Sequence, residues 1–420
     1  MKKVIIFLMV ALMALTAVFA NGNTEKTSTE SEEITLDFWV RFNDDLSDVI
    51  ADFEALHPGV KINQVQIGEN WDDLVAKYNA AMQAGDMPEL GLVGQRHGIP
   101  QIYDAGWLVP IENYMSKDEQ SEISDNFWTR YTYSGKRLVM PFGCSTPIVM
   151  VNMTILKELG YDSVPTTWDG LVEAAKKAVK DTNGDGITDI YGINFNSDTP
   201  WYIQPLVWCA GGRIATDDGS ANVVTPEMEK VLSRYASLVK DGIMPASQHK
   251  TAGQDFQNGR LLFYFISCSA VNKYAKNIGS TFEFGVAPFP SDKTFDVCVG
   301  GGGIAVFKST DEKQEMAAEF IKYLNTPEAS VKASLSLGYL PFTSGQFGLD
   351  YVKELEKDPK WQVILNQAKN IRGEGVSPVD SIVWNDMTKI LSEIEANPDM
   401  NINEALVSMQ KEIDEYMALY

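Results

Sequence analysis

Oxygen-bearing side chains between positions 181 and 189 have the types and spacing of a calcium-binding loop. Positions 1, 3, 5 and 9 of an EF-hand-like pattern are filled by Asp181, Asn183, Asp185 and Asp189. Gly186 stands at position 6, where such a loop turns sharply, but position 12 is Gly192 rather than the usual glutamate. The bidentate ligand is therefore missing from the motif. Two interpretations stay open, a structural calcium ion and a polar turn before a strand at Ile190.

Motifs for nucleophilic, metal-dependent or phosphate-transfer catalysis do not occur in the sequence. The three histidines form no HExxH motif, no serine lies in GxSxG, and no GxGxxG follows a predicted strand. The glycine run 300–303 lacks the Gly-Lys-Ser/Thr of a phosphate loop. We therefore expect no enzyme and no required cofactor. A glycosidase remains an alternative, because its two carboxylates would be distant in sequence and carry no motif.

The cysteines give no metal site. Cys144, Cys209, Cys268 and Cys298 are widely separated, and no CxxC pair occurs, which argues against zinc. Four cysteines allow three disulfide connectivities, and sequence cannot choose among them. Disulfides and buried free thiols both stay open.

The first 20 residues are typical of a cleavable export signal. Lys2 and Lys3 precede an almost wholly apolar run, and small residues, Val18 and Ala20, stand before the expected cleavage point. An uncleaved anchor is the alternative. Residues 21–33 contain no large apolar side chain and predict a flexible tether. We expect a mature protein outside the cytoplasm, in the periplasm or an equivalent space.

Size and charge limit the classes of partner. About 400 residues would remain after cleavage, more than one core usually organises, so two lobes are expected. The net charge of −22 argues against a nucleic-acid partner and against docking on anionic lipid. Solubility is sufficient to explain this acidity.

The elements that must position a site alternate between strand and helix. Ile34–Val40 alternates apolar and polar residues, a helix is predicted over 47–56, and strand, helix and strand follow near 60–67, 71–84 and 90–93. This order predicts an α/β fold with a mainly parallel sheet and helices on both faces. Ligands bind beyond the carboxyl ends of such strands. Polar candidates there are Arg41, Asn43, Asp44 and His97.

Farther along, two apolar extended runs, 138–142 and 147–152, are broken by residues 143–146, and 261–266 predicts a buried strand. From Lys313 the chain is expected to be mostly helical.

Seven short motifs occur in an order that resembles a known family. They are Phe53-Glu-Ala-Leu-His-Pro-Gly-Val-Lys-Ile, Ala84-Gly-Asp-Met-Pro-Glu-Leu, Met140-Pro-Phe-Gly-Cys-Ser-Thr-Pro with Asn152, Val164-Pro-Thr-Thr-Trp-Asp-Gly-Leu, Phe256-Gln-Asn-Gly-Arg, Val299-Gly-Gly-Gly-Gly and Gly338-Tyr-Leu-Pro. Over Ile34–Tyr420 the chain resembles extracellular solute-binding protein family 1, the substrate-binding proteins of carbohydrate ABC importers. Within it, the maltose-binding and sn-glycerol-3-phosphate-binding types are the most similar.

This resemblance implies two α/β lobes with a cleft and inter-lobe hinge strands, the periplasmic-binding-protein-like fold. The expected lobes are discontinuous: 34–143 plus 300–340, and 144–299 plus 341–420. Crossings between them are expected near 142–146, 298–301 and 338–341, where glycine suits a hinge.

The resemblance also implies ligand contacts. Trp71 matches an aromatic residue that lines the family's cleft, and Gln95 stands where the glycerol-phosphate branch has glutamate. Further positions that match cleft residues or second-lobe stacking aromatics are Ser145, Trp201, Tyr202, Ser267, Gly301 and Tyr339.

One departure concerns the phosphate ligand. The glycerol-phosphate branch holds phosphate with an arginine in its C-terminal region, but here Arg372 falls before the matched place. We therefore expect a neutral saccharide or polyol, delivered by a monomeric receptor to an ABC permease. A receptor for sn-glycerol-3-phosphate or a related phosphodiester is the alternative, and an accessory receptor of a sensor with the same fold is another.

Overall fold

The first strand starts where the sequence alternation predicts it, at Ile34. The computed structural model describes residues 33–41, 45–68, 71–94, 98–197, 199–215, 220–247 and 249–419. By its internal contacts the chain divides after Glu33, and Ile34–Tyr420 forms one unit. The predicted leader, 1–20, and residues 21–32 of the predicted tether lie outside the described residues. No helix within the described ranges is long and apolar enough to cross a membrane.

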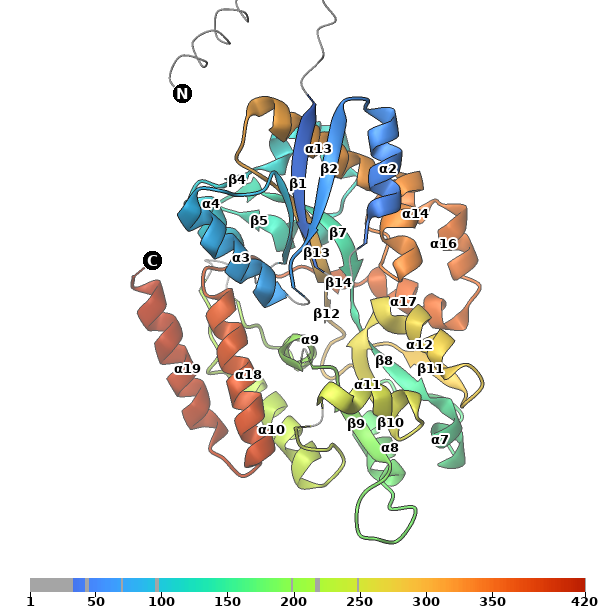
Figure 1. Ribbon diagram of the computed structural model, residues 1–420. Helices are drawn as coiled ribbons and strands as arrows, with labels where there is room; N and C mark the ends of the chain where they lie inside the picture. Colours follow the sequence, from blue (N-terminus) through green and yellow to red (C-terminus); the bar gives the residue numbers. More distant parts are fainter. Residues whose placement is uncertain are drawn as a thin grey trace, which may run out of the picture. The chain divides into compact units, whose positions relative to one another are not determined.

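The first sheet has the strand order β2-β1-β3-β13-β4, with β7 also paired to β13 (Figure 1). The strand bounds are β1 Ile34–Val40, β2 Val60–Gln66, β3 Leu90–Gly94, β4 Leu108–Val109, β7 Val139–Ser145 and β13 Gly300–Phe307. β1 is parallel to β2 and β3, but β13 is antiparallel to β3, β4 and β7. The prediction of a mainly parallel sheet is therefore wrong. Gly302 pairs with Gly94, the last residue of β3, so β13 enters from the carboxyl edge and must run the opposite way.

Helices cover both faces of this sheet. Their bounds are α2 Ser47–Leu56, α3 Trp71–Ala84, α4 Ile99–Asp104, α5 Lys117–Ser121, α6 Asp125–Trp128, α13 Asp311–Leu324 and α14 Pro327–Ala333. Phe38 packs against Phe320 of α13, with ring centroids 5.8 Å apart, whereas Trp39 stacks on Tyr78 of α3 at 5.6 Å. Successive strand residues point to opposite faces, so α13 and α3 must cover different faces.

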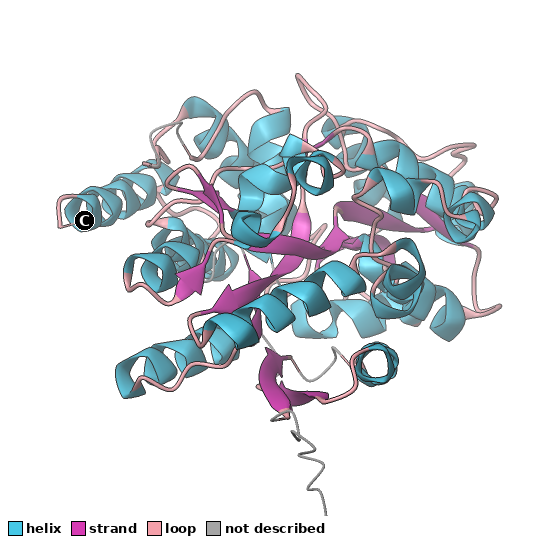
Figure 2. Cartoon of the chain, turned by 90° about the horizontal axis from the view of Figure 1, so that it is seen from above, coloured by secondary structure: helices cyan, strands magenta, loops and turns pink. Residues whose placement is uncertain are grey.

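The second sheet has the strand order β11-β8-β10-β9. Its strands are β8 Pro147–Asn152, β9 Tyr191–Phe195, β10 Leu261–Ser267 and β11 Phe284–Ala287. β10 is parallel to β9, whereas β8 is antiparallel to both β10 and β11. Phe195, Phe265 and Phe289 form part of its core, with the Phe195 and Phe265 centroids 4.6 Å apart. Seen from above, helices flank the strands on either side (Figure 2).

The remaining helices include the mostly helical region that was predicted after Lys313. Their bounds are α7 Met153–Glu158, α8 Trp168–Ala178, α9 Thr199–Cys209, α10 Pro226–Lys240, α11 His249–Gln257, α12 Val271–Ile278, α15 Ser344–Phe347, α16 Asp350–Leu355, α17 Pro359–Ala368, α18 Asp380–Ala396 and α19 Ile402–Met417. Short 3-10 helices are η1 Ile111–Tyr114, η2 Thr129–Tyr131, η3 Cys268–Ala270 and η4 Leu335–Leu337.

The chain passes between the two sheets inside the predicted crossing regions. β7 ends in the first sheet at Ser145, and β8 begins in the second at Pro147. β12 Val297–Cys298, which precedes β13, forms a small parallel pair with β14 Ile371–Arg372. The hairpin β5 Thr132–Tyr133 with β6 Lys136–Arg137 lies beside η2. The predicted lobe boundaries themselves stay a prediction.

Candidate functional site

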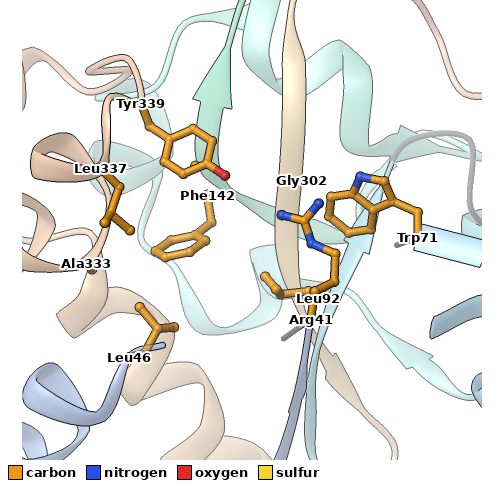
Figure 3. A pocket seen from close by; sticks show the side chains of 10 residues that line it. Arg41, Leu46, Trp71, Leu92, Phe142, Gly302, Ala333, Leu337 and Tyr339 are labelled. Carbon is orange, nitrogen blue, oxygen red and sulfur yellow. The ribbon is translucent and has the colours of Figure 1, made fainter. Parts of the chain in front are cut away.

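A small pocket of about 20 Å³ lies at the carboxyl ends of the parallel strands of the first sheet (Figure 3). It is lined by Arg41, Leu46, Trp71, Leu92, Phe142, Gly143, Gly302, Ala333, Leu337 and Tyr339. We call it the Trp71 pocket. Three of the predicted site residues, Arg41, Trp71 and Tyr339, meet there. They do so although about 270 residues separate Tyr339 from Trp71 in the sequence. The pocket is thus where the sequence analysis places a ligand.

Arg41 and Trp71 are positioned by neighbouring parallel strands. Arg41 directly follows β1, and Trp71 opens α3 after β2. The Arg41 guanidinium carbon lies 4.2 Å from the centre of the Trp71 ring, a cation–π contact. Figure 3 shows the guanidinium against the indole and the Tyr339 hydroxyl pointing toward that side. One face of Trp71 therefore already carries a cation, which a stacking ligand would replace or share.

A glycine strand forms the floor between the candidate aromatic residues. A Cβ atom on Gly302 would overlap the ring of Trp71, and one on Gly300 would overlap the ring of Trp201. Gly300 also lies beside Ser145, because its Cβ would sit 2.7 Å from the Ser145 hydroxyl oxygen. Ser145 and Trp201 thus lie beside Gly300, two residues before Gly302 of the Trp71 pocket, and neither side chain lines that pocket. The two tryptophans thus contact the same strand two residues apart, at Gly302 and Gly300.

Gly301, another predicted site residue, takes a conformation that requires glycine. Its φ is +91°, and a Cβ atom there would overlap the carbonyl oxygen of Gly143. The pairing of β13 with β7 shifts register between Gly300 and Gly302, which marks a β-bulge. Gly301 therefore positions the strand backbone.

Tyr339 reaches the pocket through a second close approach. Its ring atoms lie 3.4 Å from where a Cβ of Gly143 would stand, and the amide of Leu340 donates to the carbonyl of Cys144 at 2.7 Å. The segment after η4 is thereby fixed against β7. The third crossing near 338–341 stays a prediction.

The other predicted site residues of the second sheet are less accessible. Trp201 lies in the first turn of α9 and is 7% exposed, with a buried indole N–H that has no partner among the described residues. Tyr202 is 1% exposed and packs on Phe195. Ser267 caps η3, accepting from the amide of Ser269. The structure thus brings Trp201, but neither Tyr202 nor Ser267, to the glycine strand.

A second cavity, of about 610 Å³, was missed by the sequence analysis. It is lined by Thr129, Thr132, Tyr133, Ser134, Trp208, Arg213, Ala215, Arg372, Gly373, Glu374, Gly375, Val376 and Ser377. Three segments distant in sequence build it, and no local motif marks such a combination. Burial and the neighbouring Asp104 raise the pKa of Tyr133 to about 12, so its hydroxyl stays protonated.

The arginines of this cavity are engaged with one carboxylate. Arg213 and Arg372 both contact Asp296, at 2.9 and 3.2 Å. Arg213 also lies over the Trp208 ring, 5.3 Å from its centre. Arg372, the residue considered for phosphate, is therefore already paired.

Hydrogen bonds to its own backbone close the acidic loop in this conformation. The Asp181 carboxylate accepts backbone N–H groups of Gly186, Gly184 and Asn183, and these bonds lower its pKa. No group of three His, Cys, Asp or Glu side chains within the described ranges is arranged to hold a metal. The calcium interpretation stays a prediction, and the polar turn accounts for the contacts seen.

All four cysteines are buried free thiols. Burial raises the pKa of Cys209 to about 11, and it raises that of Cys144 further, although Arg130 opposes the shift. Cys144, Cys209 and Cys268 are therefore not poised as thiolates. Four predicted contacts, Asn43, Asp44, Gln95 and His97, lie outside the described residues.

Two sheets linked by crossover strands, with a glycine-floored pocket at the strand ends, define the periplasmic-binding-protein-like class. The family described as bacterial extracellular solute-binding protein matches residues 48–361. The chain belongs to this family, which confirms the resemblance stated from the sequence motifs.

Individual relatives agree with this assignment. A maltotriose-binding protein of Pyrococcus abyssi is 23% identical over 86% of this chain and 76% of its own length. The sn-glycerol-3-phosphate-binding periplasmic protein UgpB of Yersinia pestis is 26% identical over 79% of this chain and 80% of its own. The crystal structure of UgpB from Mycobacterium tuberculosis in complex with glycerophosphocholine has a TM-score of 0.79 at 20% identity, covering 91% and 98% of the two chains. The fold class is thereby confirmed.

Proposed function

We propose that this protein is an exported receptor that closes around a neutral saccharide or polyol and delivers it to an ABC permease. The observation that carries the proposal is the glycine strand β13, which Trp71 and Trp201 approach from the two sheets. Aromatic faces offer area to the apolar side of a sugar ring, and nearby hydroxyl and backbone groups offer hydrogen bonds. The relatives named for maltotriose support a saccharide.

Several finer features belong to the same proposal. The receptor acts as a monomer, has no catalytic role, and reaches the periplasm through a cleavable leader. The family of extracellular binding proteins supports the export and the absence of catalysis. Closure of the lobes would bury the solute and present a surface for the permease to recognise.

A second candidate solute is sn-glycerol-3-phosphate or a related phosphodiester. The Arg41 guanidinium in the Trp71 pocket favours it, since arginine binds phosphate oxygens in a bidentate manner. The relatives named for glycerol phosphate give further support. Against it, Arg372 is already paired with Asp296.

Thermal unfolding of the mature protein, unfolded once to remove carried-over solute and then refolded, tests the proposal. Maltotriose, glucose, glycerol and sn-glycerol-3-phosphate are added in turn. A tight solute at ~1,000-fold excess over its dissociation constant should stabilise the fold by about 4 kcal/mol. Stabilisation by a saccharide supports the main proposal, and stabilisation only by the phosphate ester supports the second candidate.

Trp71→Ala should remove the solute-dependent shift while leaving the solute-free melting temperature nearly unchanged. Trp107→Ala is a matched control, because Trp107 is also half-buried but lines neither cavity. Equal loss of the shift in both variants would contradict the placement of the solute in the Trp71 pocket.

A further inference from the structure

Arg130 is a buried cation whose surroundings the solute site does not explain. It lies in η2 and is 7% exposed, yet no carboxylate within the described ranges pairs with it. Its Nε–H has no hydrogen-bond partner there either. Removing a cation from water without a counter-charge costs several kcal/mol. Such a residue needs a compensating interaction.

The compensation comes from two backbone carbonyls of the crossover into the first sheet. One terminal nitrogen of Arg130 donates a short hydrogen bond to Val299 O, and the other lies 3.5 Å from Gly301 O. These carbonyls stand on either side of Gly300. The planar fork of a guanidinium can reach two acceptors at once, whereas the single ammonium of lysine cannot present the same geometry.

The two carbonyls lie at an irregular part of the first sheet. Register shifts between Gly300 and Gly302, so the regular ladder to β7 is interrupted there. Arg130 donates to carbonyls on either side of Gly300, at this irregularity. The guanidinium thus holds the backbone at the point where the chain enters the first sheet.

The contacts depend on the direction of this strand. Both carbonyls adjoin Gly300, so a rotation about Gly300 changes the two contacts. Gly300 is also where Trp201, in the first turn of α9, approaches β13. A change at Gly300 therefore also affects the packing of Trp201.

We propose that Arg130 is a positioning residue that sets the balance between separated and closed lobes by bracing the carbonyls of Val299 and Gly301. The inference rests on the proposed closing function but concerns a residue that touches no solute. The two hydrogen bonds of Arg130 favour one direction of β13. Lobe closure that alters this direction forms or breaks the contact to Gly301 O.

Hydrogen exchange and small-angle scattering of the solute-free mature protein test the brace independently of any solute. Arg130→Met keeps much of the side-chain volume and removes charge and donors. We expect exchange at amides 299–302 to accelerate at least tenfold relative to amides 263–265 of β10, and the radius of gyration to change. Arg130→Lys should restore part of the protection, so that exchange at amides 299–302 accelerates less than in Arg130→Met.

Arg137→Met is the matched control, because Arg137 lies in β6, close to Arg130 in the sequence, but pairs with Asp125, whose side chain is exposed. It should leave exchange at 299–302 and the radius of gyration unchanged. If Arg130→Met accelerates exchange uniformly, with an unchanged radius of gyration, Arg130 is only a structural residue and the proposal is overturned. If none of the solutes added in the thermal unfolding experiment stabilises the protein, the result on Arg130 still holds.

Discussion

Two side chains of this molecule, Arg130 and His249, are stabilised in opposite ways. Arg130, beside the crossover, contacts backbone carbonyls alone, whereas His249 at the start of α11 lies in a closed network of side chains. His249 Nε2 is 2.5 Å from Glu395 Oε1, and its Nδ1 is 2.9 Å from Asn194 Oδ1. Tyr235 donates to the same Glu395 oxygen at 2.5 Å.

The His249 network is the more completely satisfied of the two. Both ring nitrogens lie within hydrogen-bond distance of oxygen atoms, Nδ1 of Asn194 Oδ1 and Nε2 of Glu395 Oε1. The other oxygen of Glu395 accepts from the amide of Ser247. The four elements that meet are β9, α10, α11 and α18. A fully paired network fixes one arrangement, whereas a cation held by two carbonyls leaves the crossover adjustable.

The largest effect should come from opening the closed network. Glu395→Ala leaves His249 and Tyr235 buried without their shared acceptor, and Glu395 is only 5% exposed. We expect a loss of about 3–5 kcal/mol in the free energy of unfolding, measured by urea denaturation. Glu393→Ala, at an exposed position of the same helix, should change it by less than about 0.5 kcal/mol. Similar values for both would contradict the importance of the network.

A smaller loss is expected at the crossover. In Gly300→Ala the added methyl overlaps Trp201, and overpacking of this kind costs about 1–3 kcal/mol. Gly375→Ala is the control, because nothing lies within 4 Å of a Cβ there. Combining Gly300→Ala with Trp201→Ala should recover part of the loss in a double-mutant cycle. If the effects of the two substitutions are strictly additive, overlap with Trp201 is not the cause of the loss.

Acid should distinguish the two positions further. Burial works against the charged form, but hydrogen bonds from His249 and Tyr235 hold the pKa of Glu395 below its ordinary value of 4.5. Stability from a lowered carboxyl pKa is complete above the unfolded value and is lost as the pH falls through the folded one. Between pH 5 and 3, at about 25 °C, the wild type should therefore lose stability more steeply than Glu395→Gln. Parallel curves would show that Glu395 does not titrate differently on folding.

The smallest effect is expected from breaking an exposed ion pair that joins α10 to the segment just after α18. Lys240 at the end of α10 lies 2.5 Å from Asp399, just after α18, and both side chains are more than half exposed. Lys240→Met should not change the urea midpoint measurably, with or without added salt, because solvent screens such pairs. A clear destabilisation would mean that the exposed pair, too, holds α18.

Local patterns were enough to predict most elements, and the site was only partly predictable. Ile34–Val40 and Leu261–Ile266 were found from alternation and apolar runs, because each follows from its own residues. The antiparallel direction of β13 was not predicted, because it depends on where the chain returns from the second sheet. Motif order brought Trp71 and Tyr339 together, whereas Trp208 and Arg213 carry no signal for the cavity they line.

The position of β13 in the first sheet also bears on the order in which the protein can fold. β13 lies between β3 and β7, so β1 to β7 cannot complete their sheet until residues 300–307 exist. At about 5–20 residues per second, the roughly 150 residues between β7 and β13 take some 8–30 s to synthesise. During that interval the first third of the chain has no finished sheet. In a chain of this extracellular family, strand order alone therefore delays the completion of the first sheet during synthesis.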